Sequence, residues 1–440
     1  MSLKPAHFSL ANLIRPNILA LQPYRCARDD YQSGILLDAN ENAIGHSLPA
    51  GSFVPHDAPS SSFSSSSGTA NGTPITGSGA ADPLQLHRYP DPALYGLKER
   101  LVELRQLESS GQVFLGVGSD EVLDLIQRIC GAPGKDKVAI CPPTYGMYSV
   151  CAAVNDLGVV KVPLKLEQGE FSVDTEAVLS ALRADPSIKI LFLCSPGNPT
   201  GTLLKLSEVR RILDEPGWSG LVVVDEAYID FAEEEKRVGS RYTDVDEVSA
   251  VSLVKEYANV IVTQTLSKAF GLAAIRLGIA YAHPELIQIM NNTKAPYNIS
   301  VPTAYLGSRA LTAQGLDTMR TNVRTLIENR TWLIEALQSR CAGVGEVLGG
   351  NDANFILIQV LEEEKAASDG GSGEQRRRRQ PDSKRAGWVY KKMAEEQGLV
   401  VRNRASEMGC AGCLRITVGT KAECERCVEL MCELLGRKQQ

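Results

Sequence analysis

Residues 260–280 read VIVTQTLSKAFGLAAIRLGIA, and this stretch decides the fold. It opens with the β-branched run VIVT and closes with RLGIA, and both runs are typical of buried strands. Between them lie the hydroxyls of Thr265 and Ser267, one lysine, Lys268, and one arginine, Arg276. Because a cation is costly to place in an apolar interior without a partner, the stretch predicts a polar site between two strands.

Apolar and amphipathic segments alternate along the first 310 residues. The expected strands are KVAIC, VVKVPL, IKILFLC, LVVVDE, NVIVTQT and RLGIAYA, and helical patterns such as SDEVLDLIQRIC and SVDTEAVLSALRA separate several of them. This alternation predicts an α/β fold with a mostly parallel sheet covered by helices on both faces. A long helical stretch then leads to NFILIQV, GWVYKKMAEEQG, LVVR and CLRITVG, and this second pattern indicates a smaller α/β domain.

We expect three regions: an N-terminal arm over residues 1–83, a large domain over 84–310 and a small C-terminal domain over 311–440. Two segments, residues 47–82 and 362–385, contain few apolar side chains and are predicted to be disordered surface insertions. The second contains RRRR, which is also typical of a nuclear signal or a nucleic-acid contact. Its acidic, Gly- and Ser-rich surroundings favour a solvated loop.

The composition restricts the class of protein. The 440 residues carry a net charge of −6, which gives no indication of broad nucleic-acid binding. The first residues, MSLKPAHFSLANLIRPN, lack the apolar centre of a signal peptide, and no run approaches the roughly 18 apolar residues of a membrane span. Several of the 11 cysteines, including Cys141, Cys194 and Cys432, lie in apolar runs, as reduced core thiols do. We therefore expect a soluble, cytoplasmic protein without nucleic-acid or membrane partners.

Two C-x2-C pairs, Cys410 with Cys413 and Cys424 with Cys427, resemble the spacing of zinc ligands. However, Cys413 opens the expected strand CLRITV, and the second pair follows the helical apolar stripe of the C-terminal segment. Buried cysteines produce such spacing without any metal. We therefore expect core packing at these four positions and no metal site.

Three further polar groups follow expected strands, at the carboxyl edge where open α/β sheets bind ligands. Asp225 closes LVVVD, Asn198 projects from the turn SPGNPTG, and GVGSDEVLDL places glycines before a helix with acidic residues in its first turn. Taken alone, each is also typical of an ordinary turn or helix cap. The glycine segment lacks the third glycine of G-x-G-x-x-G, so a nucleotide-binding dehydrogenase is not indicated.

Together these groups match the needs of pyridoxal 5′-phosphate. This cofactor requires a lysine for a Schiff base, an acid beside its pyridine nitrogen, donors for its ring hydroxyl and an anion cradle for its phosphate. A poorly hydrated lysine beside a strand has a lowered pKa and becomes nucleophilic. The sequence supplies, in that order, Lys268; Asp225; Asn198 with Tyr228; and Ser119, Asp120, Thr265, Ser267 and Arg276.

Several motifs carry a resemblance to a known family. SPGNPTG, VVVDEAYIDF and TLSKAFGLAAIRLG resemble the fold-type I, class II aminotransferases, whose fold is that of aspartate aminotransferase. More narrowly, LIRPNILALQPY, LLDANEN, HRYPDP, VGSDEVLDLIQRICGAPG, CPPTYGMY and CLRITVG are similar to the histidinol-phosphate aminotransferase family. The resemblance covers residues 11–45, 84–360 and 387–435, and the two predicted insertions are departures from it.

The resemblance implies a role for each residue of the cofactor site. Lys268 forms the Schiff base and transfers protons, while Asp225 pairs with the pyridine nitrogen. The other expected cofactor contacts are Asn198 and Tyr228 at the ring oxygen, Tyr145 on the ring face, and Ser119, Asp120, Thr265, Ser267, Arg276 and Tyr89 at the phosphate. The catalytic residues are accordingly Lys268, Asp225 and Tyr228.

The resemblance also implies substrate contacts and a homodimer with shared sites. Tyr89 of HRYPDP is expected to reach the cofactor and substrate from the second subunit. Arg402 and Arg415, on the two last strands, are expected to bind the anionic ends of both substrates, although exposed strand arginines would produce the same pattern. Tyr24 is expected near the substrate's imidazole, where a packing role is an alternative.

The implied reaction is transamination between histidinol phosphate and 2-oxoglutarate, giving imidazole-acetol phosphate and glutamate in histidine biosynthesis. Two alternatives on the same fold are an aromatic amino acid transaminase and a threonine-phosphate-type decarboxylase. A third is a catalytically silent binding protein that retains the pyridoxal-phosphate fold.

Overall fold

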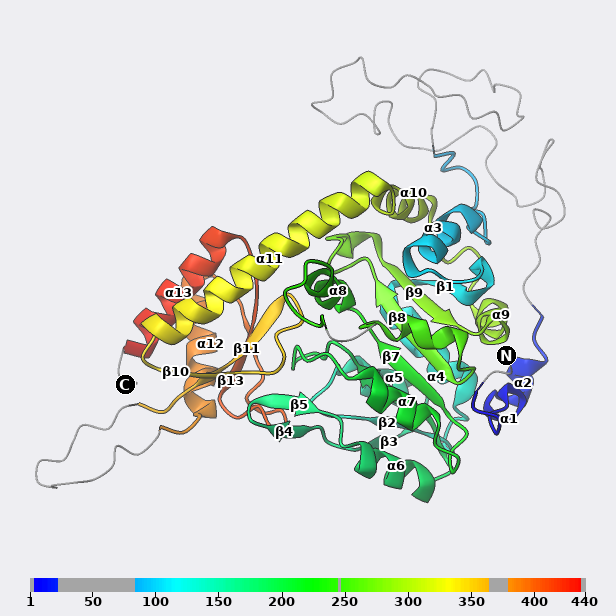
Figure 1. Ribbon diagram of the computed structural model, residues 1–440, viewed down its shortest axis with the longest axis horizontal. Helices are drawn as coiled ribbons and strands as arrows, with labels where there is room; N and C mark the ends of the chain where they lie inside the picture. Colours follow the sequence, from blue (N-terminus) through cyan, green and yellow to red (C-terminus); the bar gives the residue numbers. More distant parts are fainter. Residues whose placement is uncertain (1–3, 23–83, 244–246, 364–378, 437–440) are drawn as a thin grey trace, which may run out of the picture.

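A mixed sheet forms the centre of the computed structural model, which describes residues 4–22, 84–243, 247–363 and 379–436 (Figure 1). Within these residues the sheet has 7 strands in the order β1-β9-β8-β7-β6-β2-β3. All of them run parallel except β9, which is antiparallel to both of its neighbours. The strands are β1 (Val113–Val117), β2 (Lys137–Ile140), β3 (Gly158–Lys161), β6 (Ile188–Cys194), β7 (Leu221–Asp225), β8 (Val260–Thr265) and β9 (Leu277–Ala282).

The predicted mostly parallel sheet is confirmed, with two differences. The strand β1 was not expected, because its short run VFLGV merges in the sequence with the glycines that follow it. The strand β9 is antiparallel because only residues 266–276 connect it to β8. A parallel crossover needs a dozen or more residues, usually including a helix.

Helices cover both faces of this sheet (Figure 1). They are α3 (Tyr95–Arg105), α4 (Gly118–Cys130), α5 (Met147–Val154), α6 (Thr175–Ala184), α7 (Leu206–Leu213), α8 (Ile229–Arg237), α9 (Pro284–Thr293) and α10 (Val301–Ala310), with the 3₁₀ helices η2 (Ser110–Gln112), η3 (Ala250–Lys255) and η4 (Ala273–Ile275). Strand side chains alternate between two cores: Val222 and Val224 enter one, while Leu221 and Val223 enter the other. The second core also receives Ile18 of the N-terminal segment, which contains α1 (Leu10–Leu13) and α2 (Pro16–Leu19).

A smaller α/β unit follows, as expected, and lies beside the large sheet in Figure 1. Its strands form an antiparallel sheet in the order β10-β11-β13-β12, with bounds β10 (Val344–Leu348), β11 (Phe355–Val360), β12 (Arg402–Asn403) and β13 (Cys413–Thr417). Its helices are α11 (Ala313–Arg340), α12 (Ser383–Gln397) and α13 (Lys421–Gly436). The long helix α11 contacts both α8 and α13 and so connects the two units. A hairpin, β4 (Lys165–Glu167) with β5 (Glu170–Ser172), completes the described strands.

The predicted insertion at residues 362–385 extends too far along the chain. Arg379 donates to the carbonyl oxygens of Glu362 and Ala342, each at 2.6 Å, and Asp382 caps the first turn of α12. Arg385 is buried and donates to two carbonyl oxygens. These charged side chains lie in the folded unit because the two arginines donate to carbonyl groups at element ends and Asp382 accepts from the first N–H groups of α12. The other predicted insertion, residues 47–82, lies outside the described residues.

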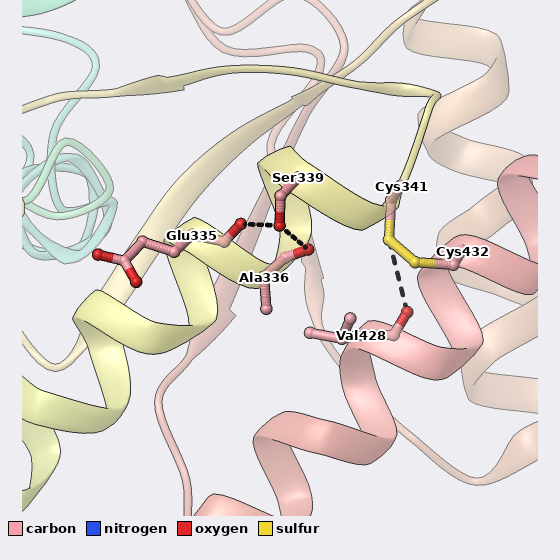
Figure 2. The surroundings of a disulfide bond; sticks show 6 residues. All are labelled: Glu335, Ala336, Ser339, Cys341, Val428 and Cys432. Carbon is pink, nitrogen blue, oxygen red and sulfur yellow. Dashed lines mark hydrogen bonds between the residues drawn. A yellow bond between two sulfur atoms is a disulfide. The ribbon is translucent and has the colours of Figure 1, made fainter.

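The expectation of a reduced thiol at Cys432 is wrong in this structure. Cys432 of α13 forms a disulfide with Cys341, which directly follows α11 (Figure 2). The two cysteines are 91 residues apart in sequence, so only the packing of α11 against α13 reveals the pair. Each cysteine by itself looks like an ordinary core residue.

The four cysteines with zinc-like spacing divide between two places. Cys410 and Cys413 pack in a small cluster with Phe171, whereas Cys424 and Cys427 lie in the core of the C-terminal unit. Core packing at these positions is what the helical and strand patterns predicted. None of the described helices is long and apolar enough to cross a membrane.

Candidate active site

The parallel strands β1, β6, β7 and β8 end at one edge of the large sheet, and the predicted site residues follow these ends. Lys268 lies in the turn after β8, with its Nζ 5.7 Å from the ring centroid of Tyr228. Burial, followed by the positive charge of Arg415, lowers the pKa of Lys268, and Asp120 opposes this shift. Burial therefore favours the neutral, nucleophilic form of this amine.

Asp225 ends β7 and is fully enclosed. Its Oδ1 accepts a hydrogen bond from Thr263 at 2.9 Å, and its Oδ2 accepts one from Tyr148 at 2.7 Å. The parallel register of β7 and β8 places Asp225 directly beside Thr263. Burial raises the pKa of Asp225, and the two hydrogen bonds oppose that shift. This acid is arranged to pair with a protonated group of a ligand.

Arg276 and the start of α4 form an anion cradle. Gly118 donates its backbone N–H to the carbonyl oxygen of Arg276 at 2.9 Å, and an Arg276 nitrogen lies 3.5 Å from Asp120. A Cβ on Gly118 would lie 2.4 Å from the Arg276 guanidinium, and one on Gly278 would lie 2.2 Å from the backbone of Gly118. Only glycine allows this close approach. The cradle therefore offers a guanidinium together with the N–H groups of a helix start.

Hydroxyl groups extend this cradle toward β8. Thr265 Oγ1 lies 2.9 Å from Ser267 Oγ and 3.0 Å from the carbonyl oxygen of Leu277. Ser119 lies in the first turn of α4, next to Asp120. Hydroxyls, an arginine and a helix N-terminus are groups that bind a phosphate dianion.

Tyr145 lies between the cradle and the buried acid. Its hydroxyl donates to Asp120 Oδ1 at 3.0 Å, and its ring meets Tyr148 edge to face with centroids 5.7 Å apart. Burial and the nearby carboxylate of Asp120 raise the pKa of Tyr145, so this hydroxyl remains protonated. An aromatic ring in this position is suited to stack on a planar cofactor.

Arg415 reaches the same edge from β13 of the smaller unit. Its Nη1 donates to Asn198 Oδ1 at 2.5 Å, and its guanidinium lies 5.0 Å from the ring centroid of Phe355. The ring of Phe355 meets Tyr228 edge to face at 5.2 Å. Burial lowers the pKa of Arg415, and its Nε is buried without a hydrogen-bond partner among the described residues. A partly buried arginine with an unused donor is suited to bind an anion.

Arg402 pairs with Arg415 across β12 and β13 and is exposed. Arg404, which the sequence reasoning missed, directly follows β12, and its charge acts on Arg415 together with that of Arg402. Its backbone N–H donates to the carbonyl oxygen of Cys413 at 2.9 Å, and its Nη1 lies 2.6 Å from Oε1 of Glu407. The charges of Arg402 and Arg404 therefore lie close to Arg415, and the charge of Arg415 lies close to Lys268.

The contacts of two further residues with this edge stay predictions. Tyr89 is 50% exposed and stacks on Tyr297 with ring centroids 4.7 Å apart. Its contact with the site of a second subunit remains a prediction. Tyr24 lies outside the described residues.

The sequence reasoning also missed Tyr148 and Thr263, the two donors to Asp225. Their spacing from predicted site residues is only a weak signal. Tyr148 lies in the first turn of α5, three residues after Tyr145. Thr263 precedes Thr265 by two residues in the same strand and therefore shares its face.

The donor set fits pyridoxal phosphate. Its four needs, namely an amine, a buried acid, a ring-oxygen donor and an anion cradle, are met by Lys268, Asp225, Tyr228 and the surroundings of Arg276. Gly118 allows the Arg276 guanidinium to lie against the start of α4. The Cβ of any other residue at this position would occupy the place of the guanidinium.

The comparisons with known proteins first establish the class of protein to which the chain belongs. The family described as Aminotransferase class I and II matches residues 73–430. Two solved structures share the fold. A histidinol-phosphate aminotransferase from Sinorhizobium meliloti, in complex with pyridoxal-5′-phosphate, has a TM-score of 0.64 at 20% identity over 80% of this chain and 83% of its own. An L-threonine-O-3-phosphate decarboxylase from Porphyromonas gingivalis has a TM-score of 0.59 at 20% identity over 80% and 92%. The predicted aspartate-aminotransferase-like fold is confirmed.

Sequence relatives narrow this class. The histidinol-phosphate aminotransferase of Schizosaccharomyces pombe is 42% identical over 94% of this chain and 95% of its own length. That of Saccharomyces cerevisiae is 40% identical over 94% and 95%. The chain belongs to the histidinol-phosphate aminotransferase family, as its motifs predicted.

Proposed function

We propose that this protein transfers an amino group from histidinol phosphate to 2-oxoglutarate with the help of pyridoxal phosphate, in histidine biosynthesis. The products are imidazole-acetol phosphate and glutamate. One observation carries the proposal: the Lys268 amine, whose pKa is lowered by burial, lies close to the charges of Asp225, Arg276 and Arg415 at one sheet edge. The chain around this site is a nearly full-length relative of histidinol-phosphate aminotransferases.

The residues divide the chemistry between them. Bound pyridoxal phosphate supplies an electron sink for the substrate's α carbon. Lys268 Nζ would anchor the cofactor, and its amine is the base placed to take the substrate's α proton. Burial lowers the pKa of Lys268 and so favours the neutral form that this step needs. Asp225 would hold a proton at the pyridine nitrogen, and Tyr228 would donate to the ring oxygen.

One anion site has to serve both substrates. Histidinol phosphate carries a phosphate, and 2-oxoglutarate carries two carboxylates. Arg415, with its buried unpaired Nε, and Arg402 beside it suit either group, because a guanidinium binds both kinds of oxyanion in the same forked geometry. Sequential use of one site predicts ping-pong kinetics.

We further propose a cytoplasmic homodimer in which Tyr89 completes the site of the other subunit. Tyr89 is half exposed, and Tyr95 of α3 is also exposed. Tyr305 and Leu306 are exposed on α10, which contacts α3. Large exposed apolar side chains gather at protein interfaces. Mixing the inactive variants Lys268→Ala and Tyr89→Phe should restore activity, because the hybrid dimer contains one intact site. Without recovery in verified hybrids, the shared site would be wrong.

The test is the absorbance of the pyridoxal-phosphate-loaded protein after one addition of an amino donor. Histidinol phosphate should convert the spectrum to that of the amine form, and subsequent 2-oxoglutarate should restore it with one glutamate per site. Phenylalanine and phosphothreonine at equal concentration should react much more slowly. Faster conversion by phenylalanine would assign an aromatic transaminase, and carbon dioxide release from phosphothreonine would assign a decarboxylase. No conversion by any donor would indicate a binding protein.

A further inference from the structure

Tyr148 is a fully buried tyrosine that the mechanism above does not use. It lies in α5, one turn after Tyr145, and its hydroxyl donates to Asp225 Oδ2 at 2.7 Å. Thr263 donates to the other oxygen, Oδ1, at 2.9 Å. Each carboxylate oxygen of Asp225 therefore has one fixed side-chain donor, and the backbone N–H of Ala227 also favours the carboxylate.

Three contacts hold Tyr148 in place. Its ring stacks on Phe192 with centroids 4.7 Å apart and planes at 8°. Its ring also meets Tyr145, and its backbone carbonyl accepts a hydrogen bond from Gln127 at 3.2 Å. Gln127 lies in α4, the helix whose first turn forms the anion cradle. The hydroxyl is therefore oriented by the same elements that position the rest of the site.

The direction of this hydrogen bond is fixed. Burial and the Asp225 carboxylate raise the pKa of Tyr148, so the tyrosine stays protonated and acts as the donor. Burial alone would favour the neutral acid at Asp225, and the hydrogen bonds from Tyr148 and Thr263 favour its carboxylate. A neutral Asp225 could not hold a proton on a pyridine nitrogen, because it would supply its own proton to the bond instead.

We propose that Tyr148 is a positioning residue for the reaction: its hydroxyl keeps the Asp225 carboxylate ionised and oriented, so that Asp225 holds a proton on the ring nitrogen of pyridoxal phosphate. This inference rests on the proposed function, since it requires pyridoxal phosphate in the site. It assigns a role in the electron sink to a residue that acts through Asp225.

The test compares two ligands that differ only at the ring nitrogen. The apoprotein is titrated with pyridoxal phosphate and with its carbocyclic analogue, in which a C–H group replaces that nitrogen. Tyr148→Phe should weaken pyridoxal phosphate by about 10- to 100-fold, as expected for a lost hydrogen bond to a charged group. The analogue should lose less than about threefold, because it has no proton for Asp225 to hold.

A matched control is Tyr257→Phe. Tyr257 is another buried tyrosine whose hydroxyl donates to an aspartate, Asp214, at 3.1 Å. It precedes β8 and therefore lies at the opposite edge of the sheet. This variant should bind both ligands as the wild type does. If Tyr148→Phe folds poorly, Thr263→Val removes the second donor and should show the same preference for one ligand.

A second measurement detects the proton on the pyridine nitrogen directly. With pyridine-¹⁵N-labelled cofactor, the wild type should give the nitrogen shift of a protonated ring at neutral pH, and Tyr148→Phe should move it toward the unprotonated value. Equal losses for both ligands, or an unchanged nitrogen shift, would overturn the role of Tyr148. A wild type that binds neither ligand would instead overturn the proposed function.

Discussion

Replacement of Arg415 by leucine should weaken both substrates of the reaction together. Arg415 donates to Asn198 and retains a buried Nε without a partner among the described residues, so it has donors free for an incoming anion. Each hydrogen bond between charged groups contributes about 1.5–3 kcal/mol. Arg402 and Arg404 remain beside the site and keep part of the positive potential.

The expected loss follows from these numbers. A forked contact of two such bonds, reduced by the remaining arginines, leaves about 3–4 kcal/mol, which corresponds to about 10²- to 10³-fold in kcat/KM. Arg415→Lys keeps the charge but loses the fork, so we expect about tenfold. The assay is single-turnover absorbance, with histidinol phosphate for one half-reaction and 2-oxoglutarate for the other.

A matched control is Arg426→Leu. Arg426 is a 52% exposed arginine of α13 whose ion pair with Glu429 lies on the surface, so its loss should change neither half-reaction. The reasoning is refuted if Arg415→Leu slows only one half-reaction, because two separate anion sites would then be required. It is also refuted if the loss is below about threefold for both substrates.

Three further predictions follow from single groups. Lys268→Ala should fold but lack the visible absorbance of a lysine-linked cofactor, and retained transamination would contradict its role. Cys341→Ser should lower the free energy of unfolding of the C-terminal unit by about 4–5 kcal/mol in denaturant titrations, because it opens a 91-residue loop closed by Cys432; an unchanged midpoint would argue against the disulfide. Burial raises the pKa of Glu226 to about 7 from 4.5. The neutral form of Glu226 therefore contributes fully to the free energy of unfolding below about pH 4.5, and this contribution is lost as the pH rises through 7. Glu226→Gln should flatten this fall of about 3 kcal/mol between pH 5 and 8, whereas a wild-type pH dependence would show that Glu226 does not titrate there.

Much of the fold is visible in the sequence because buried strands of a parallel sheet are continuous apolar runs. LVVVD and VIVTQT are rich in apolar and β-branched residues, as buried strands are, and both lie at the centre of the sheet. The short connection between β8 and β9 makes β9 antiparallel. A prediction made for each strand separately does not take the length of this connection into account. The two-residue strand β12 is shorter than LVVR suggested, because its pairing with β13 starts only at Arg402.

The residues of the site divide in a similar way. Lys268 and Asp225 stand out because a charge beside a buried strand is unusual and needs an explanation. Tyr148 and Thr263 do not stand out, since an aromatic residue in an apolar helix and a threonine in a strand are common core residues. Their function depends on contacts across the sheet, which no local pattern contains. The same holds for Cys341, whose partner is 91 residues away.

The central claim is that the Lys268 amine carries the cofactor and releases it to histidinol phosphate. The most direct measurement is borohydride reduction of the pyridoxal-phosphate-loaded protein, followed by mass spectrometry of its peptides. We predict a phosphopyridoxyl group on Lys268 alone, and its disappearance when histidinol phosphate is added before the borohydride. Label on a different lysine, or label on Lys268 that histidinol phosphate does not remove, would contradict the account.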